Sequence, residues 1–108
     1  MNKKNKVILI DIERNAPKSF KYEEYKKNNF IKFSILENNN EIDLSEYTAE
    51  IFFKLSNGNT SSVTCDIVEN LVHLPLYKIP FEKGKNITFE IVFKGKKQRV
   101  TTFKMYLV

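Results

Sequence analysis

The sequence has little of the chemistry on which most enzymes depend. It contains one histidine, one cysteine and no tryptophan, and its three glycines form no phosphate-binding loop. Nucleophilic catalysis needs a base beside the nucleophile, and zinc needs several Cys or His ligands at close spacing. His73 lies on the polar side of an alternating segment, where a solvated or edge histidine is expected. We therefore expect no enzymatic activity, no metal and no cofactor.

Disulfide bonds and long apolar runs are also missing. A single cysteine excludes an internal disulfide and gives no indication of an oxidising compartment. Cys65 alternates with Val63 and Ile67, so we expect a buried thiol. The apolar run Val7 to Ile10 ends at Asp11, which is too short for a signal sequence or a membrane span. These features predict synthesis in the cytoplasm and no membrane insertion.

Acidic residues are missing from the C-terminal end of the chain. The whole sequence carries a net charge of +5, and no Asp or Glu follows residue 94. We therefore expect one end of the fold to be basic. The lysines of residues 1–6 either add to this basic end or belong to a flexible, solvated tail. The cations of the C-terminal end are Lys94, Lys96, Lys97, Arg99 and Lys104.

What the sequence does have is alternation of apolar and polar residues. The chain has 108 residues, 42% of them hydrophobic, which predicts one globular domain spanning 1–108. Period two indicates half-buried strands, and no segment has helical period. We expect an all-β fold, an immunoglobulin-like antiparallel β-sandwich of about seven strands, with a closed barrel as the alternative. The expected strands are 7–13, 30–37, 48–55, 63–68, 72–76, 87–94 and 99–107.

The stretch from Phe30 to Leu55 organises this pattern. Two alternating segments flank the unit Ile42-Asp43-Leu44-Ser45-Glu46-Tyr47. Asp43 or Ser45 is placed to cap a single helical turn, with Leu44 and Tyr47 beneath it. After it, Asn57-Gly58 predicts a β-hairpin, because this pair accepts positive φ angles.

Residues 18–29 fit neither a strand nor an amphipathic helix. Their large side chains are Phe20, Tyr22 and Tyr25, among many lysines. One interpretation is an irregular crossover whose aromatic residues cap the core. The other is an adhesive loop, because aromatic residues among charges are typical of protein interfaces.

Carboxylates occur in pairs, such as Asp11 with Glu13 and Asp43 with Glu46. We expect the first pair to lie on a solvated strand face, and the second lacks the acidic density of a calcium site. Phe30 and Phe52 are the aromatic residues on mixed strand faces. They are candidates for stacking on sugars in a carbohydrate-binding sandwich, or on bases in a nucleic-acid-binding domain. We expect no nucleic acid partner, because most phenylalanines are needed for the core.

From Phe30 onward, the order of these features resembles the N-terminal domain of phage baseplate upper proteins. This family comprises tail components of phages and prophages of Gram-positive bacteria. The matching features are FIKFSILE, the polar turn and Ile42-Asp43-Leu44-Ser45 with Tyr47, the hairpin at Asn57-Gly58, and Gly84-Lys85-Asn86 leading into Ile87 to Phe93. The segment Val7 to Ile12 fits the opening strand of the family.

The resemblance implies an immunoglobulin-like domain that fixes a fibre or receptor-binding component to the tail baseplate of the virion. It implies other tail proteins as partners, and a trimer as the oligomeric state. An acidic partner would be steered by a basic hairpin. We predict partner-binding residues in the aromatic crossover, Phe20, Tyr22 and Tyr25, and in the basic hairpin, Lys94, Lys96, Lys97 and Arg99.

Overall fold

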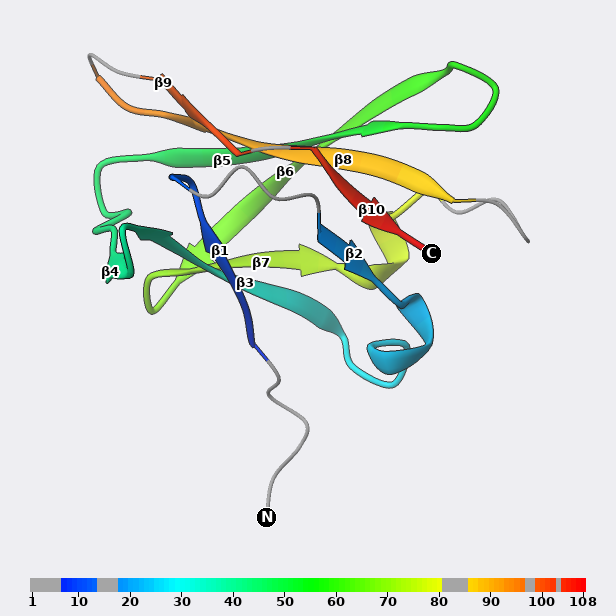
Figure 1. Ribbon diagram of the computed structural model, residues 1–108, viewed down its shortest axis with the longest axis horizontal. Coiled ribbons are helices and arrows are strands. Elements are labelled where there is room, and N and C mark those ends of the chain that lie inside the picture. The colour runs from blue at the N-terminus through cyan, green and yellow to red at the C-terminus, as the bar shows by residue number, and fades with distance from the viewer. Residues whose placement is uncertain (1–6, 14–17, 81–85, 97–98, 103) are drawn as a thin grey trace.

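The chain folds as a single curled β-sheet whose two halves enclose one core (Figure 1). The computed structural model describes residues 7–13, 18–80, 86–96, 99–102 and 104–108. These residues contain two short 3₁₀ turns and no α-helix. The elements are β1 (Val7–Asp11), β2 (Lys18–Phe20), η1 (Tyr22–Glu24), β3 (Phe30–Glu37), β4 (Asn40–Glu41), β5 (Thr48–Lys54), β6 (Thr60–Val68), β7 (Leu71–Pro75), η2 (Leu76–Lys78), β8 (Ile87–Lys94), β9 (Arg99–Thr101) and β10 (Met105–Leu107).

The all-β prediction is confirmed, and the strand order is β1-β3-β7-β6-β5-β8-β10-β2, with β4 beside β3 and β9 beside β8. β6 belongs to both halves, because its first part pairs with β5 and its last residues pair with β7. Figure 1 shows β6 crossing between the two halves. β1 and β2 stand at opposite ends of the order, so the described strands form an open sheet and not a closed barrel.

The prediction of purely antiparallel sheets is wrong. β1 runs parallel to β3, and β2 runs parallel to β10. Parallel neighbours need a long connection instead of a tight turn. Residues 12–29 provide that connection between β1 and β3, and β2 lies within it. The alternating pattern predicts which face of a strand is buried, but it does not indicate whether the neighbouring strand runs parallel or antiparallel.

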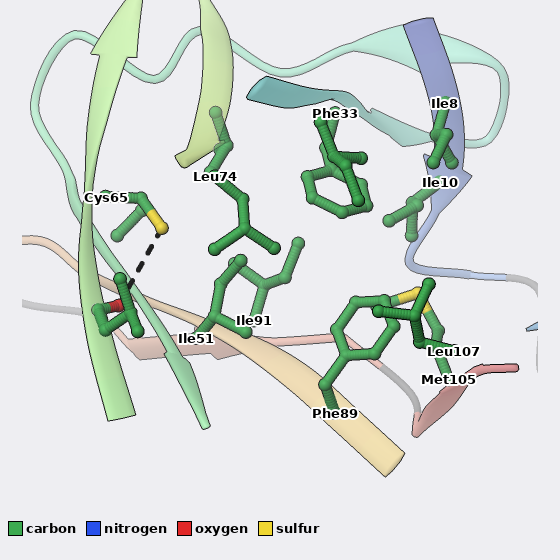
Figure 2. Close-up of a cluster of buried hydrophobic side chains, with 14 of the residues drawn as sticks. Ile8, Ile10, Phe33, Ile51, Cys65, Leu74, Phe89, Ile91, Met105 and Leu107 are labelled. Carbon is green, nitrogen blue, oxygen red and sulfur yellow. Dashed lines mark hydrogen bonds between the residues drawn. The ribbon is translucent and has the colours of Figure 1, made fainter. Parts of the chain in front are cut away.

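The core forms where the inward faces of the two halves meet. Figure 2 shows side chains from β1, β3 and β7 pointing toward those from β5, β8 and β10. Phe89 of β8 is central, with its ring centroid 6.0 Å from that of Phe33 and 6.1 Å from that of Phe53. Cys65 is buried as predicted, and its thiol donates a hydrogen bond to the Val63 carbonyl at 3.7 Å. Phe103, within the expected strand 99–107, lies outside the described residues.

The turns follow from asparagine and glycine. The Asn57-Gly58 hairpin is confirmed: the Gly58 N–H donates to the Leu55 carbonyl at 3.0 Å, and Gly58 has a φ of 91°. This geometry is a three-residue loop, in which only glycine needs the left-handed region. The β6–β7 turn uses Glu69 and Asn70, with φ angles of 52° and 63°. Asparagine tolerates this region better than most residues, which explains why it closes this hairpin.

Asn70 also holds the unit that follows β4. Its side-chain oxygen accepts a hydrogen bond from the Leu44 N–H at 2.7 Å, and its amide donates to the Ile42 carbonyl at 2.8 Å. Leu44 is buried and Tyr47 is half-buried, as predicted. The Tyr47 N–H donates to the Leu44 carbonyl at 3.0 Å, which makes a β-turn where a helical turn was expected. Asp43 accepts a hydrogen bond from the Ser45 N–H at 2.9 Å, so it fixes the start of this turn.

Candidate functional site

The strongest candidate for a binding site lies on the outer face of β5 and β8. Alternation along β5 sends Ile51 and Phe53 into the core and leaves Phe52 on the other side. Phe52 stands opposite Glu90 on β8 and Ser62 on β6. This row places a half-buried aromatic ring between a carboxylate and a hydroxyl on an outward face.

A hollow of about 370 Å³ opens over this row. Phe52 and Val92 form an apolar floor, and Val92 is only 2% exposed although it is not part of the core cluster. Among the described residues, cationic side chains line the hollow from both sides, together with one carboxylate. These charged residues are Lys54, Glu90, Arg99 and Lys104.

A break in the last strand sets the position of Arg99 and Lys104. Val92 pairs with Thr101, whereas Phe89 pairs with Met105, so the register changes by one residue between β9 and β10. At the break, buried Thr102 donates its N–H to the Ile91 carbonyl at 3.0 Å, and its hydroxyl accepts the Ile91 N–H at 2.9 Å. A β-bulge of this kind re-aims the neighbouring side chains. The predicted single strand over 99–107 is therefore two strands.

The predicted basic hairpin forms the rim of this face. Lys94 pairs with Arg99 across β8 and β9, and Lys96 is exposed between them. The Lys94 ammonium lies 3.8 Å from the Glu50 carboxylate, in a solvent-exposed pair that contributes little stability. Within the part of the chain that the structure describes, Arg99 and Lys96 have no such carboxylate partner. Lys97 lies outside the described residues.

The aromatic crossover does not form an exposed patch. Tyr25 is 3% exposed and belongs to the core, so its ring does not lie on the surface, and its contact with a partner stays a prediction. Phe20 and Tyr22 are half-buried against the same core, and the Phe20 ring centroid lies 6.2 Å from that of Phe89. The alternative interpretation, in which these aromatic residues cap the core, describes their positions. The crossover is held by the end of the chain, since the Tyr22 N–H donates to the Val108 carbonyl at 2.9 Å.

The position of Asp11 also differs from the one expected. It was expected on a solvated face, but it is 7% exposed and its carboxylate accepts three backbone hydrogen bonds. These come from the N–H groups of Asn38 at 3.1 Å, Asn39 at 2.8 Å and Glu13 at 3.0 Å. Asn38 and Asn39 both have positive φ angles, so the carboxylate fixes the β3–β4 turn. These three backbone hydrogen bonds give Asp11 a structural role in the turn.

The two candidate stacking residues lie on different halves of the sheet. Phe52 lies on β5, whereas Phe30 lies on β3 and is 39% exposed. The Phe30 ring contacts the His73 ring, with centroids 5.3 Å apart. Burial lowers the pKa of half-buried His73, and nearby Lys32 lowers it further. At neutral pH this histidine is therefore uncharged, and it supports Phe30 instead of adding charge to a site.

The acidic segment near Asp43 has no ligand-like geometry. The Asp43 carboxylate is occupied with the Ser45 N–H, and this hydrogen bond lowers its pKa. Among the described residues, no group of three or more His, Cys, Asp or Glu side chains is arranged to hold a metal ion. The same residues include no helix with the length and apolar character needed to cross a membrane.

Sequence reasoning missed most residues that line the hollow, among them Lys54, Glu90 and Val92. Alternation places all three on the outward faces of β5 and β8 together with Phe52. The missing information was the register between these strands, which brings the residues together. Sequence reasoning also missed Tyr77, which is 83% exposed at η2 and is the most exposed aromatic residue among those described.

The chain matches the model of no protein family, and no curated protein matches it.

Proposed function

We propose that this chain is a non-enzymatic attachment domain of a phage or prophage tail baseplate. In this role it docks a fibre or receptor-binding component onto the baseplate and is located in the tail of the virion. The proposal includes the immunoglobulin-like fold, and the trimeric state, that the resemblance implies. It rests on that resemblance together with one observation, the strand order.

The strand order supports the immunoglobulin-like part of the proposal. Constant-type immunoglobulin domains place strands A, B, E and D in one sheet and C, F and G in the other. Taking β1, β3, β5, β6, β7, β8 and β9 with β10 as A to G in chain order reproduces both neighbour orders, β1-β3-β7-β6 and β5-β8-β9/β10. The parallel β1–β3 pair and the sharing of β6 between the halves are departures from that fold.

The surface chemistry is consistent with attachment. An attachment domain needs a rigid scaffold and one face that complements its partner in charge. Lys94, Lys96 and Arg99 provide a positive face on the β8–β9 hairpin. Lysine side chains at an interface rim mainly increase the association rate with an acidic partner, and salt weakens this effect.

The experiment tests recovery of the chain with assembled tails. The tagged chain is expressed together with the products of the genes that neighbour its own, tail particles are purified, and the chain is detected by immunoblot. We expect it in the particle fraction. The variant Lys94→Glu/Lys96→Glu/Arg99→Glu should be strongly reduced in that fraction while keeping its melting temperature, because all three side chains are exposed.

A matched control makes the same change in charge elsewhere. Lys21, Lys26 and Lys27 are exposed at the crossover, and their replacement by glutamate should leave recovery unchanged. If the wild-type chain is absent from purified particles, the attachment proposal is wrong. If the hairpin variant is recovered as well as the wild type, the domain attaches through another surface.

A carbohydrate-binding function is the second candidate, and the half-buried Phe52 in the hollow is the observation that favours it. The discriminating measurement is a pull-down of the isolated domain with cell-wall polysaccharide. Retention that Phe52→Ser abolishes and Phe30→Ser does not would favour this function over attachment.

A further inference from the structure

The hollow over β5 and β8 has a pattern of charge that suggests what it binds. Its cations lie at different levels, that is, at different positions along the length of β8. Lys54 stands opposite Thr88, and Arg99 stands opposite Lys94. Thr88 and Lys94 are six residues apart on one strand, which corresponds to about 20 Å at the usual rise of a β-strand. One compact anion cannot contact both ends, so an occupant that uses both is an extended chain.

The middle of the hollow differs from its ends. Between the levels of Lys54 and Arg99 lie the apolar floor of Phe52 and Val92, the carboxylate of Glu90, and Lys104, which precedes the Phe89 partner Met105. A polymer with a phosphate on every unit would place a negative charge against Glu90. A peptide can alternate acidic and apolar side chains, and can therefore satisfy the ends and the middle together. The pattern favours a peptide over a nucleic acid or a polyphosphate polymer.

The site is a sheet face, and this limits how it can bind. The backbone groups of β5 are used in ladders with β6 and β8, so the occupant cannot add as another strand here. Recognition must come from side chains, with an apolar anchor in a pocket and charges around it. The hollow, at about 370 Å³, lies in the lower part of the usual range for small binding pockets. The part of the hollow over Phe52 and Val92 is the place for one apolar side chain of the occupant.

We propose that this hollow binds an extended acidic segment of a partner protein, with one apolar side chain over Phe52 and Val92 and carboxylates at Lys54, Arg99 and Lys104. This inference rests on the proposed attachment function, because it identifies the kind of segment that the baseplate partner presents. Arg99 favours a carboxylate through its planar pair of N–H donors, whereas Lys54 and Lys104 act as point charges.

The test is unbiased selection from a library of random 12-residue peptides displayed on a carrier. Selection uses the immobilised wild-type chain, with removal of peptides that also bind Lys54→Glu/Lys104→Glu. We expect enriched peptides to combine Asp or Glu with a central apolar residue. A synthetic peptide from this set, measured by fluorescence anisotropy, should bind the Lys54→Glu/Lys104→Glu variant about tenfold or more weakly.

Two further variants extend the test. One should strengthen binding of the peptide, and the other is a control that should leave it unchanged. Glu90→Gln removes the one carboxylate that the described residues contribute to the hollow, so it should strengthen binding of the acidic peptide by about threefold. Lys21→Glu/Lys27→Glu changes two exposed lysines at the crossover and should leave affinity within about twofold. All variants are first compared with the wild type by thermal unfolding, since each changed side chain projects from the sheet surface or the crossover.

Several outcomes would overturn the inference. One is a set of enriched peptides with no excess of acidic residues. Another is a peptide that binds Lys54→Glu/Lys104→Glu as tightly as it binds the wild type. A third is a thymidine oligonucleotide or a glycerol phosphate polymer that competes more strongly than the unlabelled peptide. The attachment proposal is tested separately. If the wild type is recovered with particles but selects no acidic peptide, attachment stands and this inference fails.

Discussion

Asn70 offers a quantitative test of how the turn between β6 and β7 holds the Ile42 to Tyr47 unit. Its side chain makes two partly buried hydrogen bonds, one with the Leu44 N–H at 2.7 Å and one with the Ile42 carbonyl at 2.8 Å. A third, with the Glu41 carboxylate at 2.8 Å, is exposed. Asn70 also has a φ of 63°, which disfavours most side chains. Two substitutions separate these contributions.

Asn70→Gly keeps the backbone angle and removes the side-chain hydrogen bonds. At about 1 kcal/mol for each of the two partly buried bonds, the free energy of unfolding should fall by about 2 kcal/mol. The exposed bond with Glu41 adds little. Asn70→Ala loses the same bonds and also places a Cβ atom in the left-handed region, so its cost should be about 1 kcal/mol larger.

Urea unfolding followed by circular dichroism gives both free energies, provided that the slope with denaturant is unchanged. For a domain of this size, the melting temperature should fall by about 10 °C for the glycine variant and about 15 °C for the alanine variant. Asn38→Gly is the control, because Asn38 occupies a turn with a φ of 53° and its side chain is exposed. It should change the free energy by less than about 1 kcal/mol.

The reasoning would be refuted by an Asn70→Gly variant that is as stable as Asn38→Gly. That result would mean that water replaces the Asn70 hydrogen bonds without loss. An alanine variant no less stable than the glycine variant would instead refute the contribution assigned to backbone strain.

Three further predictions concern buried groups. Burial raises the pKa of the Cys65 thiol to about 12 from 9.0, so the unfolded chain loses this proton at lower pH than the folded chain. The free energy of unfolding should therefore fall from pH 9 toward pH 12, more steeply than in Cys65→Ala. Iodoacetamide at pH 8 should label the thiol only after urea is added. Tyr25→Ala should cost about 3–5 kcal/mol, whereas Tyr77→Ala, at an exposed position, should stay within about 0.5 kcal/mol in the same urea experiment. Thr102→Val leaves the buried Ile91 N–H without its acceptor and should cost about 1–2 kcal/mol by urea unfolding; a loss as small as that of an exposed threonine would contradict the role given to the bulge.

Some of the candidate site follows from local pattern. Alternation alone placed Phe52 on an outward strand face, and the acid-free C-terminal end predicted a basic hairpin at Lys94, Lys96 and Arg99. The hollow itself does not follow from either pattern. It combines side chains of β5, β8 and the β9–β10 break, and their levels depend on long-range register and on the bulge at Thr102.

The burial of Tyr25 and Asp11 also depends on contacts between segments that are far apart in the chain. Tyr25 lies among lysines in the sequence, yet it is buried because the crossover packs back onto the core. Asp11 sits at the end of an alternating segment, yet it is buried because the N–H groups of Asn38 and Asn39 from a distant turn surround it. A polar or charged residue can be buried wherever tertiary structure supplies its partners, and those partners are not its neighbours in the chain.

The sequence by itself determined that this chain is made of strands, which side of most strands is buried, and where asparagine and glycine turn the chain, because side-chain alternation and left-handed φ preferences act within a few residues. Only the tertiary structure decided which strands are neighbours and in which direction they run. The β1–β3 and β2–β10 pairs join segments far apart in the chain, and backbone hydrogen bonds of this kind carry no residue-specific signal. The face that the proposed partner would contact depends on that pairing.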